Sequence, residues 1–250
     1  MAGRSHTCYG DPTLFRLPKG YSSAKAESGE GLLHMNPPTP HPILQLDDVG
    51  FAYPGQPALA SGWCASVGEG VTLLYGDTGT GKSTLLRVIA GTQPASGRLT
   101  LAGARLDAEP EAYKRHVFFC DPATDAFDQV TARACTAALG EGDAGFDAPL
   151  WQTLVEGFSL LPHIDKPMYM LSTGSKRKVW LAAALASGRP LVLLDEPEGA
   201  LDARSIGCLW KAIESLAARP GHAIVIASSA RLEHVPQIQL VGCIELPLRR

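Results

Sequence analysis

The pattern of hydrophobic and polar positions changes near residue 43. Residues 1–42 contain the stretches "YSSAKAESGEG" and "NPPTPHP", with few apolar side chains and several helix breakers. This composition is typical of a poorly ordered leader. Met35 lies just before the proline-rich stretch, so a translation start at Met35 and a flexible tail beginning at Met1 both stay open. We place the folded domain at residues 43–250.

From residue 43 onward, short apolar runs alternate with segments of helical periodicity. The predicted strands are 43–53, 71–76, 97–103, 116–121, 190–197, 222–228 and 238–246, and the predicted helices are 83–91, 132–140, 150–161, 175–187 and 207–218. Continuous apolar runs such as "PLVLLDEP" are typical of strands buried on both faces of a parallel sheet. The alternation predicts an α/β fold with a mainly parallel sheet, and residues from about 129 to 178 form a small helical subdomain.

Composition and charge exclude several classes of protein. The formal net charge of −3 provides no positive field for nucleic acid, so we expect no nucleic-acid partner. No window has the run of about 18–20 apolar residues that a membrane span needs. Six cysteines occur without a C-x-x-C pair, and Cys64, Cys208 and Cys243 have the apolar neighbours of buried free thiols. We therefore expect a reducing compartment without a zinc site or disulfide framework.

Residues 76–84, "GDTGTGKST", lie between a predicted strand and a predicted helix and match G-x-x-x-x-G-K-[ST]. In such a loop the backbone N–H groups and the helix N-terminus hold phosphate, the lysine neutralises its charge and the serine hydroxyl binds Mg²⁺. The sequence thus predicts a site for ATP and Mg²⁺. Its predicted binding residues are Gly76, Asp77, Thr78, Gly79, Thr80, Gly81, Lys82, Ser83 and Thr84.

Two acids follow the buried strand in "LVLLDEP". Asp195, at the end of the strand, is predicted to bind Mg²⁺ together with Ser83. The next residue, Glu196, is placed to accept a proton from an attacking water molecule as a general base.

The stretch "LSTGS" ahead of this strand resembles the signature of the ATP-binding cassette (ABC) ATPases, which usually reads LSGGQ. Ser172 and Gly174, the two residues that contact phosphate in that family, are kept. Tyr53 in "FAYPG" matches the aromatic that stacks on adenine, and Asp202 in "GALD" matches the loop that reaches across the ABC dimer. The resemblance implies a P-loop NTPase fold of the ABC type, with an antiparallel β subdomain in addition to the parallel sheet and the helical subdomain.

Two positions depart from the family pattern. The glutamine that touches Mg²⁺ in the family falls here on Cys120 or Asp121. Asp121 could supply an oxygen to Mg²⁺ or merely begin a turn, and Gln129 is a weaker substitute. The histidine that contacts the γ-phosphate is replaced by Ser229, which is shorter and uncharged, and we expect His234 to lie on the surface. Since one positioned hydrogen bond to a transition state contributes about 10²–10³ in rate, we expect slow hydrolysis.

The resemblance implies a head-to-tail dimer, with another copy or with a different ABC ATPase, that closes around ATP and drives a separate transmembrane permease. The chain would then be cytoplasmic and bound to the inner membrane through that permease, with the helical subdomain as the docking surface. Two alternatives stay open: a soluble ABC-type ATPase without a transport role, and a weakly hydrolysing partner in a heterodimer. The transported substrate is not readable from this chain.

Overall fold

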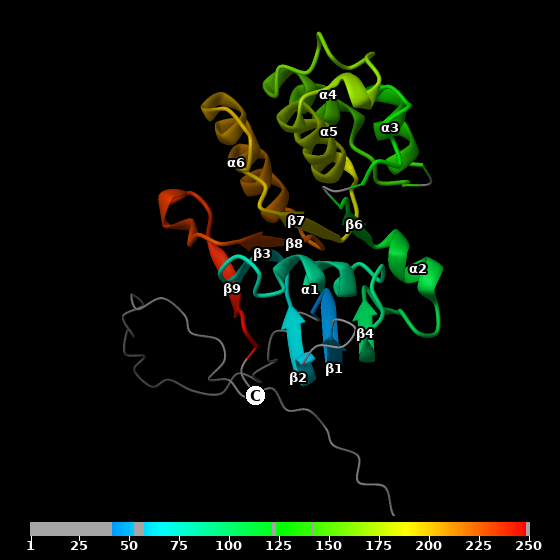
Figure 1. Cartoon of the computed structure of the whole chain (residues 1–250), viewed down its shortest axis with the longest axis vertical. Helices are drawn as coiled ribbons and strands as arrows, with labels where there is room; N and C mark the ends of the chain where they lie inside the picture. Colours follow the sequence, from blue (N-terminus) through cyan, green and yellow to red (C-terminus); the bar gives the residue numbers. More distant parts are fainter. Residues whose placement is uncertain (1–41, 53–57, 122–123, 142, 249–250) are drawn as a thin grey trace, which may run out of the picture.

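The computed structural model describes residues 42–52, 58–121, 124–141 and 143–248. Two sheets organise this part of the chain (Figure 1). The first sheet is antiparallel, with the strand order β2-β1-β4-β5. Its strands are β1 (Leu44–Ala52), β2 (Ala58–Val67), β4 (Ser96–Leu101) and β5 (Ala104–Arg105). Leu44 and Leu46 of the central strand β1 face the core, because alternate side chains of a strand share one face.

The second sheet has the order β6-β7-β8-β3-β9, and all its strand pairs are parallel. Its strands are β3 (Gly70–Tyr75), β6 (Val117–Phe119), β7 (Leu191–Asp195), β8 (Ala223–Ser228) and β9 (Leu240–Glu245). The registers pair Tyr75 with Ser228 and Asp195 with Ala227, so the carboxyl ends of β3, β7 and β8 meet at one edge. This edge is where loops carry ligand-binding groups in open parallel sheets.

Two hydrophobic cores lie on opposite faces of the parallel sheet. Helix α1 (Lys82–Ile89) packs between the two sheets, where its buried leucines contact Leu74 and Leu193 in one cluster. The other face packs against helices α4 (Ala148–Gly157), α5 (Thr173–Ala186) and α6 (Ala203–Ala217). Figure 1 shows this layering, with the antiparallel sheet and α1 below the parallel sheet and the helices above it. Alternate residues of β7 and β8 therefore pack into different cores, which is why both strands are apolar up to their last residues, Asp195 and Ser228.

The helical part of the chain also contains α3 (Ala132–Leu139) and the 3₁₀ turn η2 (Met168–Met170). Arg189, between α5 and β7, fastens this part to the sheet. Its guanidinium pairs with Asp143 at 2.8 Å and donates to the carbonyls of Val117 at 2.9 Å and Leu139 at 3.0 Å. The Arg189 guanidinium also lies 5.5 Å from the centre of the Phe118 ring.

The elements expected from the sequence are present among the described residues. The sequence did not predict β2, β5, helix α2 (Pro110–Arg115) or the 3₁₀ turns η2 and η3 (Leu232–His234). The prediction of buried thiols at Cys64, Cys208 and Cys243 was wrong, because all three are only partly buried. Among the described cysteines, Cys135 on α3 is the fully buried one, and burial raises the pKa of its thiol to about 12. In the described residues, no helix combines the length and the apolar character needed to cross a membrane.

Candidate functional site

The glycine-rich loop leads from β3 to the first residue of α1 in a tight curve. Gly79 and Gly81 have positive φ angles of 84° and 99°, a backbone region that side chains with a Cβ rarely adopt. A Cβ on Gly76 would lie 2.7 Å from the hydroxyl of Thr80. The loop thus depends on glycine at these positions, and Gly81 offers no side chain to cap the helix. The N-terminal turn of a helix is a suitable site for an anion.

Lys82 is buried beneath this loop, with only 7% of its side chain exposed. Its ammonium donates to the carbonyls of Gly76 at 2.7 Å and Asp77 at 3.1 Å. It also lies 3.4 Å from a carboxylate oxygen of Glu196. The lysine therefore joins the phosphate loop to the residue that follows β7.

The remaining loop residues differ in exposure. Asp77, Thr78 and Gly79 are exposed at the tip, whereas Thr84 is buried inside α1. The Thr80 hydroxyl donates to the carbonyl of Asp77 at 2.8 Å, which stabilises the curve. Ser83 is half-buried in the first turn of α1, and its role as a Mg²⁺ ligand stays a prediction.

Glu196 lies where three segments meet. Its φ of 44° is unusual for a residue with a Cβ, and its N–H donates to the carbonyl of Ala227 at 2.9 Å. Its carboxylate accepts a hydrogen bond of 2.8 Å from the backbone N–H of Ser229. The structure thus brings together Lys82, Glu196 and Ser229, which are far apart in the sequence. Ser229 contributes its backbone to this contact.

Asp195, the last residue of β7, pairs with Ala227 across the sheet and is half-buried beside this group. The described residues contain no cluster of three or more His, Cys, Asp or Glu side chains able to hold a metal ion. A magnesium site here would therefore combine the Ser83 hydroxyl and the Asp195 carboxylate with oxygens of the nucleotide. Hydroxyl and carboxylate oxygens are the hard donors that Mg²⁺ prefers.

The signature stretch forms the N-terminus of α5. Ser172 is the N-cap, and its hydroxyl accepts a hydrogen bond from the N–H of Ser175 at 3.1 Å. A Cβ on Gly174 would collide with the carbonyl oxygen of Ala200, so glycine permits the close approach of α5 to the loop after β7. The exposed hydroxyl of Ser172 remains on the surface of the chain.

Asp202 is the N-cap of α6 and accepts a hydrogen bond from the N–H of Ser205 at 2.9 Å. Its second carboxylate oxygen lies 2.6 Å from the ammonium of Lys178 on α5. Lys178 and Ser205 together hold the pKa of the Asp202 carboxyl well below its usual range. The signature helix and the loop that carries Asp202 are therefore joined within one chain.

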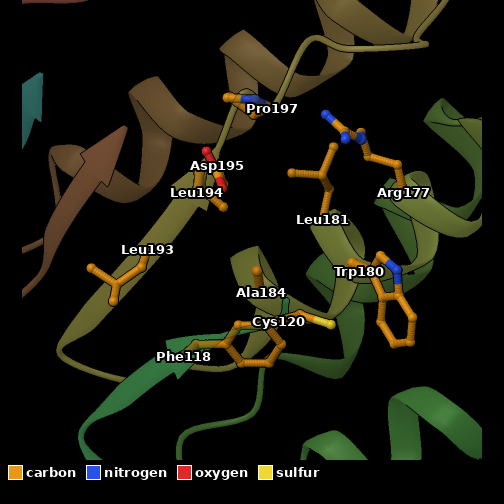
Figure 2. A pocket seen from close by; sticks show the side chains of 10 residues that line it. All are labelled: Phe118, Cys120, Arg177, Trp180, Leu181, Ala184, Leu193, Leu194, Asp195 and Pro197. Carbon is orange, nitrogen blue, oxygen red and sulfur yellow. The ribbon is translucent and has the colours of Figure 1, made fainter. Parts of the chain in front are cut away.

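Sequence reasoning missed Arg177, whose guanidinium donates to the backbone carbonyl of Glu196. Figure 2 shows Arg177 on α5 and Asp195 and Pro197 at the end of β7 around one cavity. The cavity lies between α5 and the strands β6 and β7. The run "KRK" after the signature was a possible signal, because three successive cations on one helix need partners. Arg177 and Lys178 bind the loop after β7, and Lys176 binds Asp128 at 2.5 Å.

The structure places Asp121 beside α1 in an ion pair with Arg87, with 2.7 Å between carboxylate oxygen and Nε. Arg87 lies one helical turn after Ser83, so Asp121 is on the same face of α1 as the predicted magnesium ligand. Its role as a ligand stays a prediction. Cys120 lines the cavity of Figure 2, and burial raises the pKa of its thiol. Gln129 is exposed, and Tyr53 lies outside the described residues.

His234 was expected on the surface, and this prediction is confirmed: 49% of its side chain is exposed. Its imidazole nevertheless has a specific partner. The Nε2 atom lies 3.1 Å from each carboxylate oxygen of Glu198, two residues after Glu196.

Comparison with known proteins is consistent with this geometry. A family model described as ABC transporter matches residues 64–199. The zinc import ATP-binding protein ZnuC of Halorhodospira halophila is 34% identical over 189 residues, covering 75% of this chain and 68% of that protein. The cytochrome c biogenesis ATP-binding export protein CcmA of Rhodospirillum rubrum is 39% identical over 157 residues, covering 62% of this chain and 67% of that protein.

Solved structures resemble the fold. A structure described as the ATP-binding subunit of an ABC transporter superposes with a TM-score of 0.65 at 24% identity, covering 74% of this chain and 79% of that chain. A putative ABC transporter ATP-binding protein from Pyrococcus furiosus gives a TM-score of 0.64 at 22% identity, covering 81% and 96% of the two chains.

Proposed function

The chain belongs to the ABC transporter family as one of its ATP-binding, ATP-hydrolysing subunits, and from this premise we propose how its site works. Lys82 and the backbone of residues 76–84 hold the phosphates of ATP, and Glu196 is the general base for hydrolysis. The observation that carries the proposal is the convergence at Glu196. Its carboxylate is 3.4 Å from the Lys82 ammonium and accepts the Ser229 N–H at 2.8 Å.

In the proposed reaction, Lys82 exchanges its contact with Glu196 for the β- and γ-phosphates. Glu196 then accepts a proton from a water molecule whose oxygen attacks the γ-phosphorus. The bond from that phosphorus to the bridging oxygen breaks, and ADP leaves with the bonding pair. Ser229 keeps the Glu196 carboxylate in place throughout, because its N–H donor belongs to the backbone and cannot rotate away.

Ser83 and Asp195 are the residues that would hold Mg²⁺, and Asp121 is a third candidate. The ion, when bound, neutralises the charge of the phosphates and so favours attack on the γ-phosphorus. We propose slow turnover, because Ser229 offers no charged side chain to the γ-phosphate. Preorganised donors of that kind contribute about 10²–10³ in rate.

We propose further that two such chains, or this chain and a different ABC ATPase, enclose ATP between them. Each nucleotide would lie between the phosphate loop of one subunit and Ser172 and Gly174 of the other. The exposure of Ser172 at the N-terminus of α5 supports this arrangement, since a helix N-terminus favours an anion. Asp202 would contact the partner from its position at the start of α6.

We propose that this dimer drives a separate transmembrane permease. The ZnuC relative is named for import and the CcmA relative for export, so we assign neither cargo nor direction. The helical part exposes large apolar side chains, with Leu161, Tyr169 and Met170 at 55%, 55% and 61% exposed. Exposed apolar side chains of this kind fit a docking surface for the permease. This would place the chain at the cytoplasmic face of the inner membrane.

One observation favours the second candidate, a weakly hydrolysing partner in a heterodimer. The serine at position 229 replaces a group that supports turnover, while Ser172 and Gly174 are intact and could complete the site of a more active partner. Adding a candidate partner would then raise turnover above the sum of the separate subunits.

ATP binding and phosphate release by the purified chain test the proposal. Lys82→Ala should weaken binding of a fluorescent ATP analogue at least about 10-fold, since it removes the buried cation that faces the phosphates. Lys211→Ala, which removes an exposed lysine on α6, is the matched control and should leave binding unchanged. Equal binding by both variants would contradict the assignment of the site. Purification from detergent-solubilised membranes should recover a multi-span protein with the wild-type chain.

A further inference from the structure

Glu198, Trp210 and His234 form a cluster just behind the proposed base, here called the Glu198 cluster. The indole N–H of Trp210 donates to a carboxylate oxygen of Glu198 at 2.7 Å. The His234 Nε2 lies 3.1 Å from both oxygens of the same carboxylate. The rings of Trp210 and His234 meet edge to face, with 6.4 Å between their centres. The three side chains come from three different segments of the chain.

The cluster joins the two segments that position Glu196. Glu198 belongs to the loop after β7, two residues beyond Glu196, and His234 belongs to the turn η3 (Leu232–His234), five residues beyond Ser229. Trp210 on α6 is 3% exposed and so provides a fixed anchor in the core. A small cavity bounded by Glu196, Glu198, Trp210 and Leu232 lies between the two segments.

The contact that the cluster would support is exposed. Ser229 and Ala230 lie on the surface, and the side chain of Glu196 is 42% exposed. A single hydrogen bond in such a place is worth little by itself, because water competes for both partners. The Glu196–Ser229 and Glu198–His234 contacts join the same two segments, the loop after β7 and the segment after β8. Once one contact has formed, the other costs less conformational entropy, so each contact stabilises the other.

We propose that Glu198 and His234 are positioning residues for Glu196. They fasten the segment after β8 to the loop after β7 and to buried Trp210, and thereby keep the Ser229 N–H on the Glu196 carboxylate. This role rests on the proposed function of Glu196 as the base. Neither residue touches the reacting atoms.

Single-turnover hydrolysis of ATP by His234→Ala provides the first test. The rate of the chemical step should fall about 10-fold, since small misplacements of a catalytic group have effects of this size, while ATP affinity stays within twofold. Glu198→Gln should show the same loss, and the double variant should be no slower than either single variant.

Glu233→Ala is the matched control, because it removes an exposed side chain from the same turn. It should leave the rate unchanged. A His234→Ala rate equal to that of wild type would overturn the proposal.

A second measurement is independent of turnover. The amide proton of Ser229, followed by NMR at one pH, should exchange with solvent about 10-fold faster in His234→Ala, since local opening exposes the N–H to water. Unchanged exchange would overturn the positioning role. If exchange accelerates but Glu196→Gln hydrolyses ATP like wild type, the assignment of Glu196 as the base fails. The cluster would then hold the segment without positioning a base.

Discussion

The ion pair between Arg189 and Asp143 fastens the helical part of the chain to the parallel sheet, and its removal should be strongly destabilising. The two side chains are 19% and 6% exposed, and the guanidinium also donates to two backbone carbonyls. Arg189→Ala leaves Asp143 buried without its cation, which costs about 3–5 kcal/mol for pairs of this kind. With an m-value of about 2 kcal/mol/M in urea, the unfolding midpoint should fall by about 2 M.

The chain provides its own control for this experiment. Arg219 and Asp147 form a second pair of the same chemistry, 3.2 Å apart, but their side chains are 41% and 28% exposed. Arg219→Ala should cost only about 0–1 kcal/mol, because solvent screens an exposed pair. The double variant Arg189→Met with Asp143→Leu should be more stable than Arg189→Ala, since it leaves no buried charge. Equal urea midpoints for Arg189→Ala and Arg219→Ala would show that the buried ion pair stabilises the fold no more than the exposed one.

Two further predictions concern the loop after β7. Gly174→Ala should push α5 away from the carbonyl of Ala200 and so lower the melting temperature. Differential scanning calorimetry of wild type and variant measures this change. An unchanged melting temperature would mean that α5 does not approach the Ala200 carbonyl closely. Because Lys178 and Ser205 depress the pKa of Asp202, its carboxylate stabilises the fold at neutral pH, and this contribution is lost as the pH falls below about 4. Urea midpoints of Asp202→Asn at pH 7 and pH 3 should therefore differ less than those of wild type, and an equal difference would contradict the contact.

Structural elements were predictable from the sequence where a hydrophobic periodicity coincides with a characteristic motif. The phosphate loop, the buried strand before Asp195 and the helix after Ser172 each combine a clear periodicity with a characteristic motif. Strand β2 has small residues and an internal Gly62 in place of a clear alternation, and it becomes a strand through pairing with β1. Local sequence carries no signal for such a strand.

The contacts that tune the site were beyond sequence reasoning for a different physical reason. Arg177 and Glu196 are 19 positions apart, and Glu198 and His234 are 36 apart. The topology of the parallel sheet brings Glu198 and His234 together, because the loops after β7 and β8 leave the same edge. Arg177 reaches Glu196 from α5, which packs against one face of that sheet. Buried thiols were also misplaced, since Cys135 is covered by the packing of helices that the sequence did not position.

Single-turnover hydrolysis of ATP by Ser229→Ala, with Glu196→Gln as its reference, is the most direct test of Glu196 as the general base held by the backbone of residue 229. The structure assigns the contact with Glu196 to the backbone N–H of Ser229, which alanine keeps. Ser229→Ala should therefore retain turnover within about threefold of wild type, whereas Glu196→Gln should lose about 10²-fold or more with the general base. Loss of turnover in Ser229→Ala, together with full turnover in Glu196→Gln, would contradict the account.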